Sequence, residues 1–176
     1  MLGMRATTPK PTMFSPLIHL SRAGRIGLLE ELFDEVLVPP CVERETIDEA
    51  KELGKPGTRA IKRGREKGWI EIEEVRDEDE IEKMAESENI EPEDAEVLQL
   101  AKETSSKLIT NDSWLVKVAK ANGVETLWTT TLVLLAVERG KIGKEEGRKL
   151  LKELARSGLY LKSDVYGDLL DAIEKL

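Results

Sequence analysis

Three acidic residues lie where predicted strands end and predicted helices begin. Glu45 is one to two turns into a helix, Asp94 is in the first turn of another, and Asp112 directly follows a strand. Because ligands of α/β proteins gather at the carboxyl ends of parallel strands, we expect the three side chains to converge at one sheet edge. Converging carboxylates repel one another, and a divalent cation or bound protons would relieve that repulsion. Taken singly, an Asp at a helix start most often caps the free N–H groups of that helix.

Apolar patterning predicts strands that alternate with helices along the chain. Short strands are expected over 36–38, 69–75, 107–110 and 124–128. Helices are expected in two pieces over 16–33, broken at Gly24, and then over 41–53, 58–67, 76–89, 93–104, 113–122, 130–139, 143–156 and 163–175. Strands joined through helices run parallel with right-handed crossovers. The predicted fold class is therefore α/β, with a three-layer helix–sheet–helix arrangement around a mainly parallel central sheet.

The composition limits the partners and the chemistry. The chain has 176 residues, of which 40% are hydrophobic, enough for one compact domain with a real core. Its net charge is −8, whereas a protein that holds nucleic acid by charge alone is expected to be basic. Either there is no nucleic-acid partner, or the acids are clustered and need divalent cations. Charged residues reach 35%, a habit of proteins from hot environments that a helix-rich mesophilic protein can share.

Single cysteine and histidine residues exclude several kinds of site. Cys41 cannot form an internal disulfide or a cysteine-rich zinc site, and His19 has no second histidine to join it in zinc chemistry. No apolar stretch approaches the ~20 residues that span a bilayer, and the first residues do not resemble a signal peptide. We therefore expect a cytoplasmic protein without a membrane segment.

Four segments, in order, resemble the sequence motifs of the PIN domain family. They are SPLI at 15–18, VPPCVERE at 38–45, DAEVLQLA at 94–101 and LITND at 108–112. The resemblance runs over about residues 13–170 and points to an archaeal and bacterial subgroup with an extra C-terminal helical segment. On this basis the chain divides into an irregular N-terminal arm (1–12), a PIN-like domain (13–142) and a helical extension packed on the same domain (143–176).

The resemblance implies a metal-dependent nuclease that cuts RNA. In that family a pocket of carboxylates holds one or two Mg²⁺ or Mn²⁺ ions, which activate water for in-line attack on a phosphodiester and neutralise the departing charge. By position, the catalytic residues and metal ligands would be Glu45, Asp94 and Asp112. Ser15, Thr110 and Asn111 would supply positioning hydrogen bonds. The implied partners are RNA, an antitoxin protein and a second copy of the chain in a homodimer.

One position departs from the family pattern. The family's first strand ends in an Asp two residues before Ser-Pro, where this chain has Met13, and no acidic residue precedes Glu30. Thioether sulfur is a poor ligand for Mg²⁺. The preceding stretch also contains Pro9 and Pro11, and proline cannot donate a hydrogen bond within a central strand. We therefore expect a degraded first strand and weak or absent nuclease activity.

Three explanations for Met13 stay open on the sequence alone. The chain could be a catalytically inactive PIN-like module that still binds RNA or protein, which is the alternative to the nuclease hypothesis. It could instead act with three carboxylates and more metal-bound water. An altered reading upstream could also hide the true first strand.

Other features have both a functional and a structural interpretation. A basic cluster could contact RNA phosphates, or it could form a solvated helix face paired with nearby acids. The cluster consists of Arg59, Lys62, Arg63, Arg65 and Lys67. Trp114 and Trp128 are expected in the core, although either could stack on a base. The apolar faces of 132–137 and 150–161 could form the homodimer surface or complete the core. The simpler interpretation of Ser15 is a cap for the helix that opens beside it.

Overall fold

The computed structural model describes residues 10–44 and 56–176 of the chain. The strands are β1 (Thr12–Met13), β2 (Val36–Val38), β3 (Ile70–Ile72), β4 (Leu108–Thr110) and β5 (Thr126–Trp128). The helices are α1 (Ser15–Arg22), α2 (Gly27–Phe33), α4 (Pro56–Lys67), α5 (Glu78–Glu88), α6 (Pro92–Thr104), α7 (Ser113–Ala121), α8 (Thr129–Glu138), α9 (Lys144–Arg156) and α10 (Ser163–Lys175). A further helix begins at Cys41 and is described as far as Arg44. The predicted alternation of strands and helices is confirmed, while the prediction for 45–53 lies outside the described residues.

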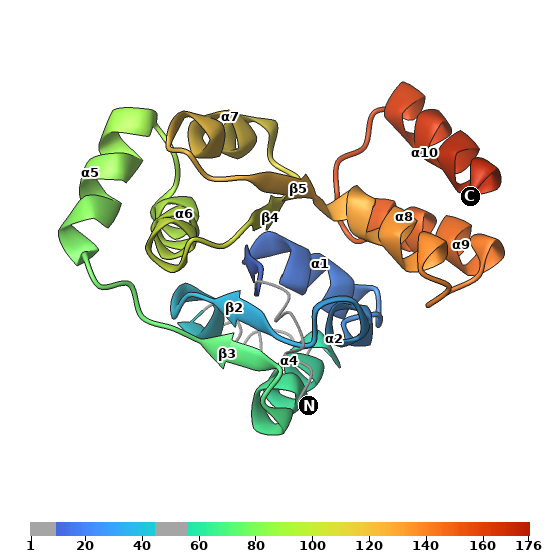
Figure 1. Ribbon diagram of the computed structural model, residues 1–176, viewed down its shortest axis with the longest axis horizontal. Coiled ribbons are helices and arrows are strands. Elements are labelled where there is room, and N and C mark those ends of the chain that lie inside the picture. Colours follow the sequence, from blue (N-terminus) through green and yellow to red (C-terminus); the bar gives the residue numbers. More distant parts are fainter. Residues whose placement is uncertain (1–9, 45–55) are drawn as a thin grey trace, which may run out of the picture.

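The five strands run parallel in one sheet with the order β3-β2-β1-β4-β5. Helices cover both faces, with α5, α6 and α7 on one side and α1, α2, α4 and α8 on the other (Figure 1). The predicted three-layer α/β fold is therefore confirmed. Because β1 lies between β2 and β4, the carboxyl ends of these three strands open next to one another at the middle of one sheet edge.

Successive residues of a strand pack into different cores. Met13 and Ile109 are Cα partners in the β1–β4 pairing, and both are buried in the larger core, which α1, α2, α4 and α8 share. Leu108, one residue earlier on β4, is buried in the smaller core with α6 and α7. This alternation is what a sheet covered by helices on both faces requires.

Apolar side chains of the last three helices complete the larger core. Leu132 and Val133 of α8, Leu151 and Leu154 of α9, and Ile173 of α10 are each completely buried within the chain. This burial agrees with the core interpretation of the two apolar faces. The homodimer stays a prediction.

The first strand is present and central, which corrects the expectation of a degraded strand. Its two residues, Thr12 and Met13, are both completely buried. Pro11 has no N–H to donate, but it contributes to the sheet only as an acceptor: its carbonyl oxygen accepts the N–H of Leu37 at 2.8 Å. The donor on the other side is Thr12, whose N–H donates to the carbonyl oxygen of Lys107 at 2.9 Å.

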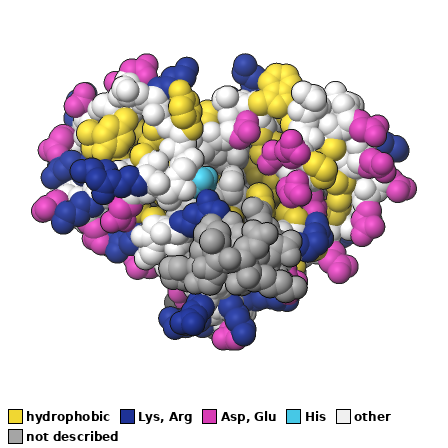
Figure 2. Space-filling view, turned by 180° about the vertical axis from the view of Figure 1, so that it is seen from behind, with side chains coloured by type: hydrophobic (Ala, Val, Ile, Leu, Met, Phe, Trp, Pro, Cys, Tyr) yellow, Lys and Arg dark blue, Asp and Glu magenta, His cyan; other side chains and the backbone are white. Residues whose placement is uncertain are grey.

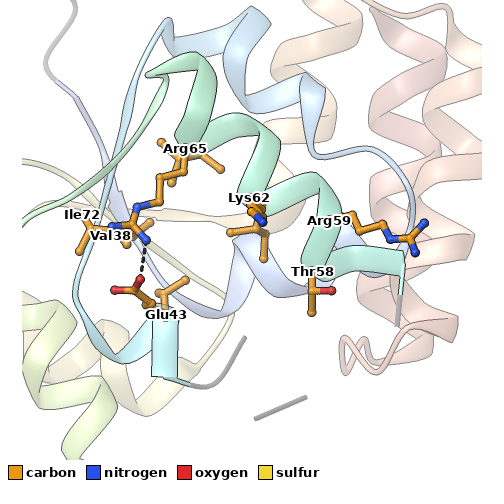
Figure 3. A pocket seen from close by; sticks show the side chains of 10 residues that line it. Val38, Glu43, Thr58, Arg59, Lys62, Arg65 and Ile72 are labelled. Carbon is orange, nitrogen blue, oxygen red and sulfur yellow. Dashed lines mark hydrogen bonds and ion pairs between the residues drawn. The ribbon is translucent and has the colours of Figure 1, made fainter. Parts of the chain in front are cut away.

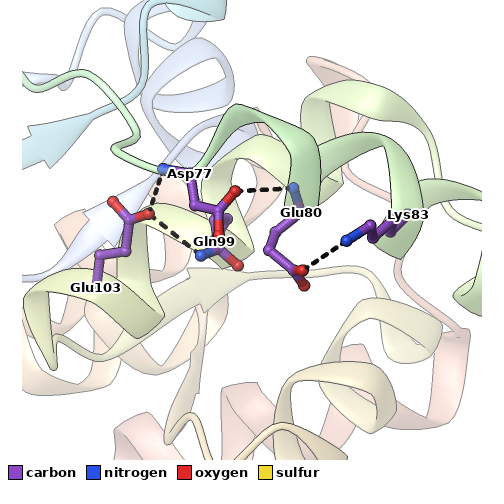
Figure 4. Close-up of polar contacts among 5 residues, drawn as sticks. All are labelled: Asp77, Glu80, Lys83, Gln99 and Glu103. Atoms are coloured by element: carbon purple, nitrogen blue, oxygen red, sulfur yellow. Dashed lines mark hydrogen bonds and ion pairs between the residues drawn. The ribbon is translucent and has the colours of Figure 1, made fainter.

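One carboxylate holds the segment before α5 against α6. Glu103 of α6 accepts the backbone N–H groups of Arg76 (2.8 Å) and Asp77 (3.0 Å) and the side-chain amide of Gln99 (3.2 Å). Asp77 in turn caps the first turn of α5 (Figure 4). Burial raises the pKa of Glu103, but the two backbone N–H donors outweigh burial and hold that pKa below its usual value. This network fixes the position of α6, the helix that carries one of the candidate acids.

Candidate functional site

Asp112 lies at the carboxyl end of β4 and caps α7. Its Oδ1 accepts the N–H groups of Trp114 (2.8 Å) and Leu115 (3.0 Å), and its own N–H donates to Thr110 Oγ1 at 3.2 Å. The capping interpretation is thus confirmed for this residue. Within the described part of the chain, no hydrogen bond is recorded for Oδ2, and the side chain is exposed. Capping therefore orients the carboxylate and leaves its second oxygen for another partner.

Asp94 is not a cap. The cap position of α6 is Glu91, no side chain caps this helix start, and Asp94 is half-buried in its first turn. Burial, followed by the negative charges of Asp112, Glu93 and Glu91, raises the pKa of Asp94 to about 6. The contribution of Asp112, 18 positions later in the sequence, agrees with the packing of α6, which carries Asp94, against β4, which Asp112 follows.

Two buried side-chain oxygens at the same sheet edge have no hydrogen-bond partner among the described residues. Asn111 donates its amide to the carbonyl oxygen of Tyr160 at 3.4 Å, while its Oδ1 is left unsatisfied. The second is the hydroxyl of Thr129, which follows β5 as Asn111 follows β4. Buried polar atoms in proteins normally have a partner. An amide oxygen from the residue before Asp112 matches, together with the carboxylates, the oxygen ligands that Mg²⁺ and Mn²⁺ prefer, so the donor chemistry fits a hard cation.

Glu96 ties the helix that begins at Cys41 to α6. This buried carboxylate accepts the N–H of Cys41 at 3.3 Å and the guanidinium of Arg44 at 3.0 Å. Glu96 therefore holds residues 41–44, which precede Glu45 in the sequence, against α6 at a position two residues after Asp94. Glu45 itself lies outside the described residues, so its predicted role is untested. Burial, followed by the charge of Glu96, raises the pKa of the Cys41 thiol well above its usual range, which keeps that thiol protonated and unreactive.

Sequence reasoning missed Glu96 as a structural anchor. The only signal was an acid inside an otherwise apolar run of α6, where a buried charge requires a partner.

The predicted positioning residues lie at the same edge with different contacts. Thr110 is buried, and its hydroxyl accepts the N–H of Asp112, so it fixes the turn that presents this acid. Ser15 is half-buried directly after β1 and is already the first helical residue of α1. The predicted cap by Ser15 is wrong, because the residue in the cap position is Phe14 and no side chain caps this helix.

Met13 supplies no ligand at this edge. Its side chain is completely buried among the apolar residues of the larger core. Among the residues that the structure describes, no group of three or more acidic, histidine or cysteine side chains is arranged to hold a metal ion. The described acids therefore form a pair, Asp94 and Asp112, and a third acid would have to come from outside the described ranges.

The basic cluster of α4 lies beside β2 and β3 rather than beside β4. It borders a cavity of about 360 Å³ whose floor is apolar, with Val38, Ile70 and Ile72 among the lining residues. Figure 3 shows Arg59, Lys62 and Arg65 extending from α4 at this cavity. In the described ranges, only Arg65 of the five basic residues forms an ion pair, with Glu43 at 2.5 Å. The five side chains are exposed, and RNA contact by them stays a prediction.

Two tryptophans are exposed, so the expectation that they lie in the core is wrong. Trp114 is 50% exposed and Trp128 is 40% exposed. The indole N–H of Trp114 donates to the carbonyl oxygen of Glu88 at 3.0 Å, which holds the ring between α7 and the end of α5. By contrast, Trp69 is buried. The backbones of both residues adjoin the segment that ends in Asp112: Trp114 follows Asp112 by two positions, and Trp128 is the Cα partner of Thr110.

The comparison with known families agrees with this fold. The model of a family described as PIN domain matches residues 14–175. The chain therefore belongs to the PIN domain family, and the predicted resemblance is confirmed. No curated protein and no solved structure gives a significant match. Nuclease character and use of divalent metals are what this family implies.

The surface and the helix lengths add two observations. Seen from behind, acidic side chains gather around exposed hydrophobic ones on the half of the molecule that α5, α6 and α7 form (Figure 2). None of the helices in the described ranges is both long and apolar enough to cross a membrane.

Replacing Asp94 is expected to stabilise the protein above pH 6. The folded pKa of about 6 lies above the ordinary value of 3.8, so the charged form at neutral pH disfavours folding. Asp94→Asn should raise the melting temperature at pH 8 by roughly 2–4 °C, which corresponds to about 1 kcal/mol after allowance for solvent screening. The gain should shrink as the pH falls below 6 and disappear below pH 3.8, where the carboxyl is protonated in both the folded and the unfolded chain.

Thermal unfolding of Asp94→Asn and of Glu78→Gln, both in EDTA, tests this expectation. Glu78 is an exposed acid in the first turn of α5, so it controls for loss of a favourable charge at a helix start. An Asp94→Asn protein that is no more stable than wild type at pH 8 would show that the two acids do not strain the fold.

Proposed function

We propose that this PIN domain protein is a divalent-metal-dependent endoribonuclease whose turnover is weakened by the apolar residue at position 13. The observation that carries the proposal is that Asp112 follows β4 at the carboxyl edge of a parallel sheet, while α6, which carries Asp94 in its first turn, packs against β1 and β4. A fold does not stabilise itself by bringing two carboxylates together, because each raises the free energy of the other's charged form. Functional sites are the usual reason for such an arrangement.

Asp94 and Asp112 would hold the cation, with Asn111 Oδ1 as a neutral oxygen donor beside them. Glu45, which follows Arg44 in the sequence and lies outside the described residues, is the proposed third carboxylate. A bound Mg²⁺ or Mn²⁺ would supply Lewis-acid activation of water and of the phosphodiester, together with stabilisation of the departing charge. The −8 net charge of the chain disfavours binding of RNA by charge alone, and cations held by these acids would offset part of that charge, which favours the metal-dependent mechanism.

The protein's own groups hold and orient the site. The N–H groups of Trp114 and Leu115 fix one oxygen of Asp112, so the other points in a defined direction. Asp94 must lose its proton for the site to bind a cation, so binding should release protons below pH 6 and weaken as the pH falls. The hydroxyl of Ser15, which follows β1, is available to position water or a phosphate oxygen.

A second candidate function is supported by the burial of Met13. Its side chain packs in the larger core instead of presenting an oxygen at the end of β1. Loss of a ligand from such a site weakens metal affinity by an order of magnitude or more, judged from changes at supporting residues alone. A protein without catalysis that binds RNA or a protein partner, such as an antitoxin, would accommodate this replacement. An association of two copies of the chain belongs to either proposal.

Removing one charge from the acid pair is expected to abolish metal binding without unfolding the protein. Asp112→Asn keeps a side-chain oxygen that can cap α7, but it loses the charge that a cation needs. Wild type should show a rise in melting temperature that depends on Mn²⁺ concentration, and Asp112→Asn should show none. The measurement is a thermal shift titration with Mn²⁺ at pH 8.

Asp77→Asn is the matched control, because Asp77 caps α5 as Asp112 caps α7 but lies away from the acid pair. This variant should keep the full Mn²⁺ shift. An Asp112→Asn protein that responds to Mn²⁺ as wild type does would remove the metal site at this sheet edge.

Restoring an acid at position 13 separates the two candidate functions. Met13→Asp adds a carboxylate at the end of the central strand, so it should lower stability in EDTA, increase the Mn²⁺ shift and raise the rate of RNA cleavage by at least about tenfold. Cleavage of a labelled single-stranded RNA in Mn²⁺ measures the rate. Met13→Leu, which keeps the core apolar, should leave the wild-type rate unchanged.

A folded Met13→Asp protein that binds Mn²⁺ more tightly but cleaves no faster would favour the binding module over the nuclease.

A further inference from the structure

We propose that Trp114, Trp128 and Tyr160 form a base-stacking platform that selects single-stranded RNA at the acid pair. The inference rests on the proposed function, in that it names the form of RNA that the site would act on. These three side chains are 50%, 40% and 79% exposed. Each one is linked to the short segment Thr110–Asp112, and the links come from three different parts of the chain.

Trp114 lies on the α5 side of that segment. Its backbone N–H donates to Asp112 Oδ1, so the residue is part of the cap that orients the acid. Its indole N–H donates to the carbonyl oxygen of Glu88, at the end of α5. The ring is therefore held in place at its polar end while half of its surface remains in water, as a stacking surface requires.

Trp128 lies on the β5 side of the segment. It is the Cα partner of Thr110 in the β4–β5 pairing, and partners in parallel strands direct their side chains to the same face. Thr110 in turn accepts the N–H of Asp112. Trp128 is thus beside the turn that presents Asp112, and it is the last residue before α8.

Tyr160 comes from the connection between α9 and α10, which runs back toward β5 (Figure 1). Its carbonyl oxygen accepts the side-chain amide of Asn111, the neighbour of Asp112. At 79% exposure, its ring is the most exposed large hydrophobic side chain of the described residues. This hydrogen bond holds the backbone of Tyr160 beside Asn111, and the exposed ring can stack on a base.

The other aromatic residues show that this exposure is selective. The chain has only seven aromatic residues. Phe33 and Trp69 are buried, and Phe14 and Tyr166 are partly buried against the larger core. Every aromatic residue with more than a third of its surface exposed is therefore one of the three that adjoin Thr110–Asp112. Packing of the core does not explain why these three rings remain in water.

Stacking also resolves the charge problem of this protein. A net charge of −8 gives little general attraction for phosphates, so affinity has to come from the bases. Base–aromatic stacking contributes without regard to sequence, because every base has a π-face. Two exposed lysines without an ion pair in the described ranges, Lys117 one turn after Trp114 and Lys162 two residues after Tyr160, can contact the backbone between stacked bases.

This arrangement selects against double-stranded RNA. In a duplex the bases are already paired and stacked on one another, and a protein can reach only backbone and groove edges. The exposed rings could not stack on the bases of a duplex, and the acid pair would repel the phosphates of two strands instead of one. The platform is therefore specific for unpaired segments.

The test is binding of the full-length protein to labelled ribo-oligonucleotides in EDTA, where metal-dependent cleavage cannot occur. The probes are an oligouridylate of about 12 nucleotides, within the range that single-strand binding sites cover, an abasic ribose-phosphate chain of the same length, and an A–U duplex. Fluorescence anisotropy measures affinity, and quenching of tryptophan emission reports stacking. The variants are Trp128→Leu and Tyr160→Ala, with Val165→Ala as control because Val165 is an exposed apolar residue of α10.

We expect the single strand to bind best and to quench tryptophan emission, and each aromatic variant to bind it roughly 5- to 100-fold more weakly. Val165→Ala should bind as wild type does. Equal binding of the three probes, or unchanged affinity in both aromatic variants, would overturn the platform. A wild-type dimer that becomes monomeric in the aromatic variants while RNA affinity stays the same would also overturn it, and would assign the rings to an interface between two copies.

The platform and the proposed function fail in different ways. Tight, quenching single-strand binding without cleavage in Mn²⁺ supports the platform and contradicts the nuclease. Cleavage by the Trp128→Leu and Tyr160→Ala variants with the kcat and KM of wild type contradicts the platform and leaves the nuclease intact.

Discussion

The mutual repulsion of two carboxylates, Asp94 and Asp112, is the constraint on which the interpretation of this structure depends. One acid belongs to the first turn of α6 and the other to the turn between β4 and α7, and each is held there by contacts unrelated to the other. Glu103 fixes α6 against the segment before α5, while Thr110 and the N–H groups of α7 fix Asp112. The fold thus maintains an arrangement that is unfavourable in isolation and becomes favourable once a cation is bound.

The strand order explains why these elements meet. With β1 between β2 and β4, helices that follow β2 and β4 begin on either side of the central strand. α6 spans this distance: Asp94 interacts with Asp112 beyond β4, and Glu96, two residues later, binds Cys41 and Arg44 beyond β2. The central strand ends in the apolar Met13, between the two strands that these polar elements follow. Its burial stabilises the core at the position where an acid would complete the site.

Much of the fold follows from local sequence. Apolar runs such as 36–38 and 107–110, and the helices between them, were predictable because a buried parallel strand must be aliphatic. β1 was harder to predict because it has two residues and follows a proline, and its pairing depends on a donor supplied by Leu37 and an acceptor supplied by Lys107. Such partners, distant in the sequence, leave no periodic signal. The convergence of Glu45, Asp94 and Asp112 stays a prediction: Asp112 follows β4 as expected, Asp94 lies in the first turn of α6, and Glu45 lies outside the described residues.

The side chains whose surroundings were predicted wrongly or missed have a common cause. Trp114 and Trp128 were expected in the core because they adjoin apolar segments, but the first turn of α7 and the end of β5 lie at the edge of the sheet, where side chains meet water. The sequence also could not reveal that Glu96 is a structural anchor, since its partners are 52 and 55 residues away. Local patterns indicate which residues are apolar, and the topology decides which of them are covered.

Anomalous scattering from crystals soaked in Mn²⁺ tests the central claim most directly. We predict one peak between the carboxylates of Asp94 and Asp112, with Asn111 Oδ1 close enough to share the ion. The absence of a peak there, with the two carboxylates unchanged and Mn²⁺ bound elsewhere, would contradict a metal centre at this edge of the sheet.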